Sequence, residues 1–141
     1  MSDAKNTRSF GDCKLIELPK IQDPRGNLTF VEAENHIPFP IKRMFLTYGI
    51  PQGAARGGHA LKSCVQLLMA SSGSFDVILR DGKEERTYRL EKPNHGLLLP
   101  PMIWREMENF SDGAVCLVLA SEPYDESGYY RDFDDFVNAL G

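Results

Sequence analysis

Gly53 to Gly73 reads GAARGGHALKSCVQLLMASSG, and this stretch organises the interpretation of the whole chain. His59 follows Gly53 after five residues, and Leu61 follows His59 with one residue between them. Four residues separate Leu61 from Gln66, and six residues separate Gln66 from Gly73. Residues i and i+2 of an extended strand project from the same face. We therefore expect the side chains of His59 and Leu61 to point the same way, toward the interior if the strand belongs to a barrel.

This spacing resembles the first motif of the cupin superfamily, G-x5-H-x-H-x4-E-x6-G. The glycines and the first histidine match, whereas Leu61 replaces the second histidine and Gln66 replaces the glutamate. In metal-binding cupins these positions hold a divalent ion. Leucine cannot bind a metal, and a neutral amide is a poor replacement for a carboxylate. The stretch keeps the cupin scaffold and predicts the loss of its metal site.

A second stretch, from Pro100 to Asn109, resembles the second cupin motif, P-x-G-x2-H-x3-N, and keeps its proline and asparagine. Arg105 stands where the fourth metal ligand would be. A guanidinium there would repel a metal ion and suit an anionic ligand. We therefore predict a metal-free cupin that uses no cofactor.

Length and composition fit a single cupin domain at residues 12–141, preceded by a flexible N-terminus at residues 1–11. The net charge of -4, with no basic stretch, argues against nucleic-acid binding. No apolar run approaches the roughly 20 residues that span a bilayer, and the N-terminus lacks a signal-peptide core. The three cysteines, Cys13, Cys64 and Cys116, are odd in number and lack metal-site spacing. Cys64 and Cys116 lie in apolar strand-like runs, which predicts buried free thiols in a cytoplasmic protein.

Short alternating segments separated by turn residues predict an all-β barrel with one C-terminal helix. The helix is expected at residues 132–140, where apolar residues follow helical spacing, and it should cover Tyr129 and Tyr130. Turns are expected at residues 23–26 and 81–82. Strands are expected at residues 13–18, 27–33 (half-buried), 42–48, 59–62, 63–70, 74–80, 85–90, 97–99, 103–107 and 114–120.

More than spacing supports a narrower resemblance. The R-G-x-H-A around His59, the run GSFDVILRDG from Gly73 and the tail LASEPYDE from Leu119 look like one cupin family. It is the family of dTDP-4-keto-6-deoxyglucose 3,4-ketoisomerases, and the resemblance extends from about Leu15 to Phe136. It implies a homodimeric double-stranded β-helix that moves a ketone from C4 to C3 of the sugar. It also implies products used for 3-amino-3,6-dideoxy sugars of bacterial surface polysaccharides such as O-antigen.

The reaction implied by this resemblance needs a general base and hydrogen-bond donors. Removal of the C3 proton needs a base, and His59 aligns with the family's catalytic histidine. The developing oxyanion needs fixed donors, for which Arg56 and Arg105 are candidates and Gln66 is a neutral one. Alternatively, His59 is an ordinary core histidine without a catalytic role.

The remaining predicted contacts bind the substrate. The diphosphate needs cations, which Arg25, Lys62 or Arg56 could supply. Tyr48 could relay a proton, and Trp104 could stack on the nucleobase of the substrate or belong to the core. We therefore take Arg25, Lys62, Gln66, Tyr48 and Trp104 as candidate substrate-binding residues.

The chain also departs from the family pattern. Leu61 replaces a second histidine that suits a proton shuttle between oxygens, and Phe45 and Leu98 replace tyrosines. We expect these three apolar residues to line the pocket. Such apolar residues are what a non-catalytic cupin that binds a sugar nucleotide would show. The other alternative, a 3,5-epimerase acting on the same substrate, is disfavoured by Phe45 and Leu98, because those enzymes need a tyrosine acid. The C4 stereochemistry, the nucleotide carried and the sharing of the site between subunits stay open.

Overall fold

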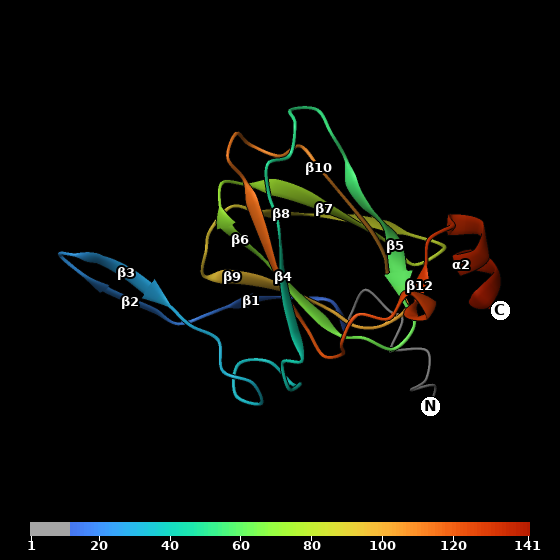
Figure 1. Cartoon of the computed structure of the whole chain (residues 1–141), viewed down its shortest axis with the longest axis horizontal. Helices are drawn as coiled ribbons and strands as arrows, with labels where there is room; N and C mark the ends of the chain where they lie inside the picture. Colours follow the sequence, from blue (N-terminus) through green and yellow to red (C-terminus); the bar gives the residue numbers. More distant parts are fainter. Residues whose placement is uncertain (1–11) are drawn as a thin grey trace.

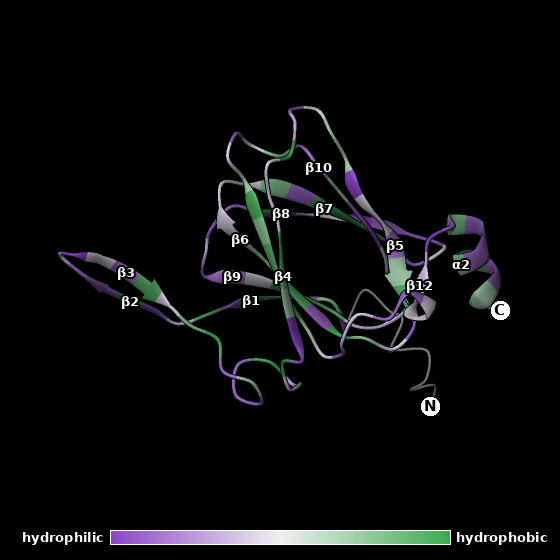
Figure 2. Cartoon of the chain, in the orientation of Figure 1, coloured by the Kyte–Doolittle hydropathy of each residue, from purple (hydrophilic) through white to green (hydrophobic). Residues whose placement is uncertain are grey.

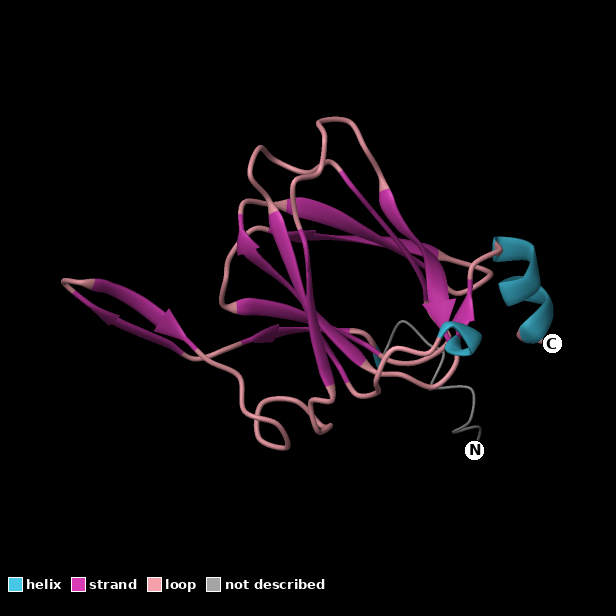
Figure 3. Ribbon diagram, in the orientation of Figure 1, coloured by secondary structure: helices cyan, strands magenta, loops and turns pink. Residues whose placement is uncertain are grey.

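The strands of the computed structural model, which describes residues 12–141, form two antiparallel five-stranded sheets (Figures 1 and 3). The predicted flexible segment, residues 1–11, lies outside the described residues. The first sheet has the strand order β1 (Lys14–Glu17), β9 (His95–Leu99), β6 (Gln66–Ser72), β11 (Val115–Ala120), β4 (Arg43–Thr47). The second has the order β12 (Tyr129–Tyr130), β5 (Arg56–Leu61), β10 (Trp104–Glu108), β7 (Phe75–Arg80), β8 (Glu85–Leu90).

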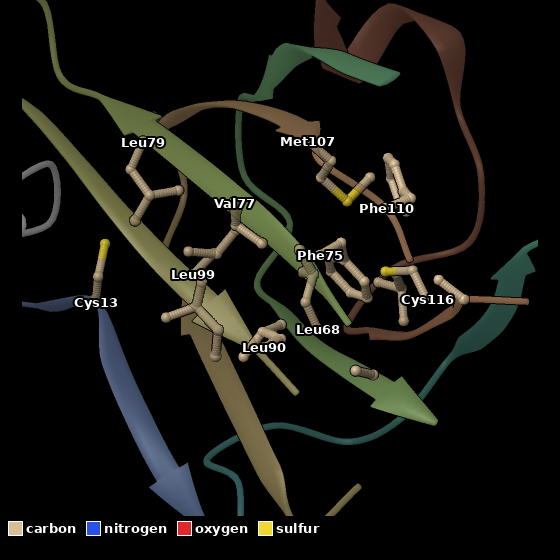
Figure 4. Close-up of a cluster of buried hydrophobic side chains, with 14 of the residues drawn as sticks. Cys13, Leu68, Phe75, Val77, Leu79, Leu90, Leu99, Met107, Phe110 and Cys116 are labelled. Carbon is tan, nitrogen blue, oxygen red and sulfur yellow. The ribbon is translucent and has the colours of Figure 1, made fainter. Parts of the chain in front are cut away.

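The two sheets enclose an apolar core, part of which is shown in Figure 4. Alternation along β7 turns Phe75, Val77 and Leu79 inward, where each is fully buried. Burial of each such side chain contributes about 1.5–3 kcal/mol. Strand pairs that are remote in sequence close the barrel, as where β6 lies between β9 and β11. The predicted all-β cupin barrel, a jelly roll with a short C-terminal helix, is confirmed.

The helix α2 (Phe133–Ala139) covers the outer face of the second sheet. Its Phe136 is fully buried against Ala60 of β5 and Trp104 of β10. Tyr130 packs against the same cluster, so the prediction that this tyrosine lies under the helix is confirmed. The predicted helix differs by one residue at each end, which is within the fraying of helix termini.

A hairpin of β2 (Lys20–Asp23) and β3 (Gly26–Thr29) projects away from the barrel (Figure 1). Its predicted turn is present, with Gly26 at a φ of +135°. The prediction of a half-buried strand over residues 27–33 is wrong, because β3 ends at Thr29 and Leu28 is 56% exposed. An alternating strand buries one face only when another layer covers it, and residues 12–141 of one chain supply no layer over this hairpin.

Cys64 and Cys116 are free and buried, as the sequence predicted, and Cys13 is free and buried as well. Burial raises the pKa of Cys13 and of Cys116 to about 12, so both stay protonated at neutral pH. Within residues 12–141, histidines, cysteines and carboxylates do not gather in a group of three that could hold a metal ion. Helices in the described part of the chain are too short or too polar to cross a membrane.

Candidate active site

Side chains from both sheets meet in the barrel interior. His59 of β5 and Arg105 of β10 are direct partners in the antiparallel register, so they project from the same face of their sheet. Gln66 extends from β6 of the other sheet and accepts a hydrogen bond through Oε1 from Nη1 of Arg105, at 2.6 Å. The motif histidine, the motif glutamine and the arginine of the second motif therefore form one cluster.

A bulge in β5 adds Arg56 to the same face. The register between β5 and β10 shifts so that Met107 lies opposite Arg56. Gly57 takes the extra position with a φ of +88°, and a Cβ there would lie 3.3 Å from Cε of Met107. Without the extra residue, Arg56 would face away from His59. Because Arg56 is exposed, it lies at the mouth of the barrel rather than in its interior.

Several buried polar atoms of this cluster have no hydrogen-bond partner among the residues that the structure describes. They are Nε and Nη2 of Arg105, Nε2 of Gln66 and the ring nitrogen Nδ1 of His59. Arg105 is only 2% exposed, so bulk water does not compensate its guanidinium. A buried polar group left unpaired costs about 1–3 kcal/mol. A bound molecule with oxygen acceptors would pair these groups, which is why we regard this interior as the candidate active site.

Burial also sets the charge state of the two central groups. Desolvation, reinforced by the cations Arg105 and Arg131, lowers the pKa of His59 to about 3. The imidazole is therefore neutral at pH 7 and able to accept a proton. Burial lowers the pKa of Arg105 to about 10, which leaves the guanidinium positively charged at neutral pH. The site thus places a neutral base beside a fixed cation.

The sequence analysis missed Tyr129. This residue pairs with Leu61 across β12 and β5, and its ring centroid lies 5.2 Å from that of His59. Nη2 of Arg43 donates a hydrogen bond to its phenol oxygen at 3.2 Å. We predicted Tyr129 and Tyr130 to pack together under the helix, but neighbours in a strand face opposite sides. That alternation was a signal that only one tyrosine of the pair could lie under α2.

An exposed ion pair borders Tyr129. Nη2 of Arg131 lies 2.9 Å from Oε1 of Glu126, and the guanidinium carbon lies 4.2 Å from the centroid of the Tyr129 ring. Hydrogen bonds from Arg131 and then from Tyr124 lower the pKa of Glu126 to about 2. These contacts link side chains within the chain segment that carries Tyr129 and so stabilise its conformation.

Three predicted substrate contacts lie elsewhere, and we do not retain them. Trp104 is buried on the outer face of its sheet, edge-on to Phe133 of α2 at 5.3 Å. Lys62 is exposed, with its ammonium 5.0 Å from the ring of Tyr130 on that outer face. Tyr48 follows the end of β4 and is 70% exposed. The period-2 alternation puts Lys62 and Trp104 on the faces opposite to those of His59 and Arg105.

The structure also shows where Leu98, Phe45 and Arg25 lie. Leu98 does not line the interior, because it packs on the outer side of β9 with Leu67 and Leu119. Phe45 does face the interior core. Arg25 lies at the turn of the projecting hairpin with 90% of its side chain exposed, beside Asp23. Within its own chain, Arg25 is therefore remote from the barrel interior (Figure 1).

The fold and site define a cupin barrel with a buried neutral base and a buried arginine, and comparisons with known proteins narrow this class. The family model described as FdtA, WxcM-like, C-terminal, matches residues 11–141. A TDP-4-oxo-6-deoxy-alpha-D-glucose-3,4-oxoisomerase from Aneurinibacillus thermoaerophilus is 42% identical over 123 residues, which cover 87% of this chain and 88% of the relative.

Solved structures show the same relationship. The sugar 3,4-ketoisomerase QdtA of Thermoanaerobacterium thermosaccharolyticum, in complex with TDP, superposes with a TM-score of 0.91 at 37% identity, over 93% of this chain and 96% of QdtA. A 3,4-ketoisomerase from Helicobacter canadensis superposes with a TM-score of 0.89 at 40% identity, over 92% and 97% of the two chains. The chain belongs to the FdtA-like family of sugar 3,4-ketoisomerases.

Proposed function

We propose that this protein is a metal-independent isomerase that moves the ketone of a dTDP-linked 4-keto-6-deoxyhexose from C4 to C3 through an enediol or enediolate. The observation that carries this proposal is the buried cluster of His59, Arg105 and Gln66, which combines a neutral base with unpaired donors. The family relationship supports the same reaction, since its relatives are named for it.

The mechanism follows from the charge states of these groups. His59 accepts the C3 proton, and the electrons of the C–H bond form the C3–C4 double bond while negative charge grows on O4. Arg105 and Gln66 have free buried N–H groups that donate to this oxygen. The proton of the C3 hydroxyl passes to O4, the imidazolium returns its proton at C4, and the carbonyl forms at C3. Because the donors are fixed before reaction, they stabilise the charge without reorganising.

The diphosphate of the nucleotide needs positive charge at the mouth of the barrel. Arg56 lies at the start of β5, on the bulge, and Arg43 lies beside Tyr129, which pairs with Leu61 at the opposite end of β5. The guanidinium of Arg43 has a buried Nε without a partner among the described residues. Guanidinium groups bind phosphate oxygens through paired donors, so both arginines suit this role.

A homodimer would complete two exposed features of this chain. The outer face of the first sheet exposes Met44 and Leu46, and the hairpin exposes Ile21 and Leu28 (Figure 2). A groove of about 710 Å³ runs between this face and the base of the hairpin. Apolar patches of this kind mark protein interfaces. The hairpin of one copy packed on the sheet of another would bury both surfaces.

This arrangement also gives Arg25 a route to the substrate. The hairpin turn cannot serve the interior of its own barrel, because it extends away from it (Figure 1). In a homodimer the same turn could approach the mouth of the other barrel and add a cation there. We therefore include Arg25 in the proposal as a substrate-binding residue that acts on the second copy.

The setting of the reaction is part of the proposal. We place the protein in the cytoplasm, where three free buried cysteines remain reduced. Its 3-keto product would be a precursor of 3-amino-3,6-dideoxy sugars for surface polysaccharides such as O-antigen. The ligand partner is the dTDP-sugar, with no role for nucleic acid or a membrane.

NMR with dTDP-4-keto-6-deoxyglucose in D2O tests the function, with EDTA present to remove any metal. The expected result is a 3-keto product that carries deuterium at C4, because the proton on His59 exchanges with D2O before it is returned. Deuterium at C3 and C5 without ketone migration would show a 3,5-epimerase instead. Shifted resonances without exchange would show a non-catalytic sugar-nucleotide-binding cupin. Activity that chelation abolishes and a stoichiometric metal restores would contradict the metal-free mechanism.

A further inference from the structure

Migration of a ketone to the neighbouring carbon transfers two protons. One moves from C3 to C4, and His59 is placed to carry it. The other must leave the hydroxyl on C3 and reach the oxygen on C4. Interior positions near His59 that could have carried a second proton-transfer group hold Leu61 and Phe45, which have no titratable hydrogen. The proposed reaction therefore needs another group beside His59.

Tyr129 is the described phenol in direct ring contact with His59, with their centroids 5.2 Å apart. It faces the interior because it pairs with Leu61, which lies two residues after His59 on β5 and therefore on the same face. A two-residue strand thus places a hydroxyl where the motif has lost a histidine. The position next to the base means that one bound sugar ring could contact both side chains.

The hydrogen bonds of the phenol leave its proton available. Arg43 donates to the phenol oxygen, so the O–H hydrogen of Tyr129 can point to another acceptor. Arg43 itself is held by aromatic rings, with its guanidinium carbon 5.1 Å from the centroid of Phe45 and 5.6 Å from that of Tyr124. A fixed cation at this oxygen favours the negative charge that the oxygen gains on giving up its proton.

We propose that Tyr129 is the second catalytic residue and moves a proton from O3 to O4 of the 4-keto-6-deoxyhexose. As His59 takes the C3 proton, the phenol gives its proton to O4, and a neutral enediol forms. The phenolate then takes the proton of O3, whose electrons form the new carbonyl at C3. The electrons of the C3–C4 double bond take the proton of His59 at C4. Both residues return to their starting state, and no oxidant or cofactor is consumed.

The test replaces Tyr129 with phenylalanine, which keeps the ring and removes only the hydroxyl. Tyr130→Phe is the matched control, because Tyr130 is the next residue of β12 and packs near Phe136 on the other face. Each variant is incubated with dTDP-4-keto-6-deoxyglucose in D2O. Formation of the 3-keto product and deuterium entry at C3 of the recovered substrate are measured separately.

Without the phenol, His59 still removes the C3 proton, but the enediolate lacks its proton exchange between oxygens and returns to substrate. Tyr129→Phe should therefore form product about 10²-fold or more slowly. Exchange at C3 should fall much less, so the ratio of exchange to product should rise. Tyr130→Phe should keep the wild-type ratio, and Leu61→His in the Tyr129→Phe background should recover product formation by supplying an imidazole on the same face.

This inference rests on the proposed function, and the two can fail separately. Wild-type protein that neither exchanges the C3 proton nor forms product would overturn the proposed function. An active wild type together with a Tyr129→Phe variant of unchanged product rate would overturn the role of Tyr129 alone. A variant that loses exchange and product in equal proportion, with thermal unfolding and dTDP binding like those of wild type, would also contradict it, since a packing defect around His59 produces that pattern.

Discussion

The barrel interior and the outer surface of the first sheet each leave a different kind of group uncovered. In the interior, buried polar atoms of Arg105, Gln66 and His59 lack partners among the described residues. On the outer surface, apolar side chains such as Met44 are exposed, as is Leu28 on the neighbouring hairpin. Unpaired buried donors call for a small ligand with oxygen acceptors. Exposed apolar side chains call for a protein surface that excludes water. We therefore place the chemistry in the barrel interior and not in the groove between the first sheet and the hairpin.

His59→Asn should produce the largest effect, because it removes the base and keeps a hydrogen-bonding side chain of similar volume. We expect kcat to fall on the order of 10²–10⁴-fold, with little change in dTDP binding. Turnover of dTDP-4-keto-6-deoxyglucose and calorimetric titration with dTDP measure the two quantities. A variant that keeps near-wild-type turnover and C3 exchange would show that the base lies elsewhere.

Arg105→Met should separate activity from stability. Methionine keeps much of the side-chain volume but removes the donors, so kcat should fall about 10²–10³-fold. Removing a buried, incompletely paired cation should leave the free energy of unfolding unchanged or raise it. Activity assays and urea unfolding of Arg105→Met and Arg105→Lys provide the comparison, with lysine retaining the charge. A large loss of stability in the methionine variant would mean that Arg105 serves the fold.

Light scattering of the outer-surface variants tests the other half of the comparison. The wild type should have twice the 15.9 kDa mass of one chain. Leu28→Lys combined with Met44→Lys places charges on both exposed surfaces and should give the mass of a monomer. Lys83→Glu, at the tip of the β7–β8 hairpin, is the control and should leave the dimer intact. A wild-type protein that is monomeric at micromolar concentration would refute the interface.

Mixed dimers test whether Arg25 of one copy reaches the active site of the other copy. A chain with His59→Asn and a chain with Arg25→Ala should each be impaired alone. If Arg25 serves the other copy, a mixed dimer contains one site with both native residues and regains part of the activity. Mixtures that show only the sum of the separate activities would confine Arg25 to a role outside the active site.

The buried histidine should also make stability depend on pH. The pKa of His59 is about 3 in the folded protein and about 6.5 when exposed, so between these values the unfolded state binds more protons. Its contribution to the free energy of unfolding is therefore lost progressively as pH falls from about 6.5 toward 3. Urea unfolding at pH 7 and pH 4.5 should show a larger decrease for wild type than for His59→Asn. Equal decreases would contradict the assignment of a desolvated imidazole.

Lys62→Ala should have the smallest effect, since Lys62 lies over Tyr130 on the outer face. An exposed cation–π contact contributes about 0.5–1 kcal/mol. We expect unchanged kcat and KM with a stability change of that size. Arg56→Ala is the contrasting variant, because Arg56 faces the mouth and its loss should raise KM. A raised KM for Lys62→Ala would show that Lys62 does contribute to substrate binding.

Local sequence patterns predicted the residues whose positions depend on one strand or one motif. His59, Gln66 and Arg105 were found because the motif spacing and the alternation of strands fix their faces. Tyr129 was missed because its position depends on the pairing of β12 with β5, between segments far apart in the sequence. Trp104 was misplaced because its chemical type was weighed without the alternation that puts it opposite Arg105. Leu98 was misplaced because correspondence to a family tyrosine does not reveal which face of a strand a residue occupies. The hairpin alternates like a half-buried strand, although no layer formed by residues 12–141 covers it.

A crystal structure of His59→Asn with dTDP-4-keto-6-deoxyglucose tests the central claim most directly. We predict that the sugar lies inside the barrel, with its C4 oxygen about 2.7–3.2 Å from donors of Arg105 or Gln66 and its C3 facing residue 59. Tyr129 should then contact the oxygens of the same ring. A sugar bound instead in the groove over β4, β11 and β6, with the buried donors still unpaired, would contradict the account.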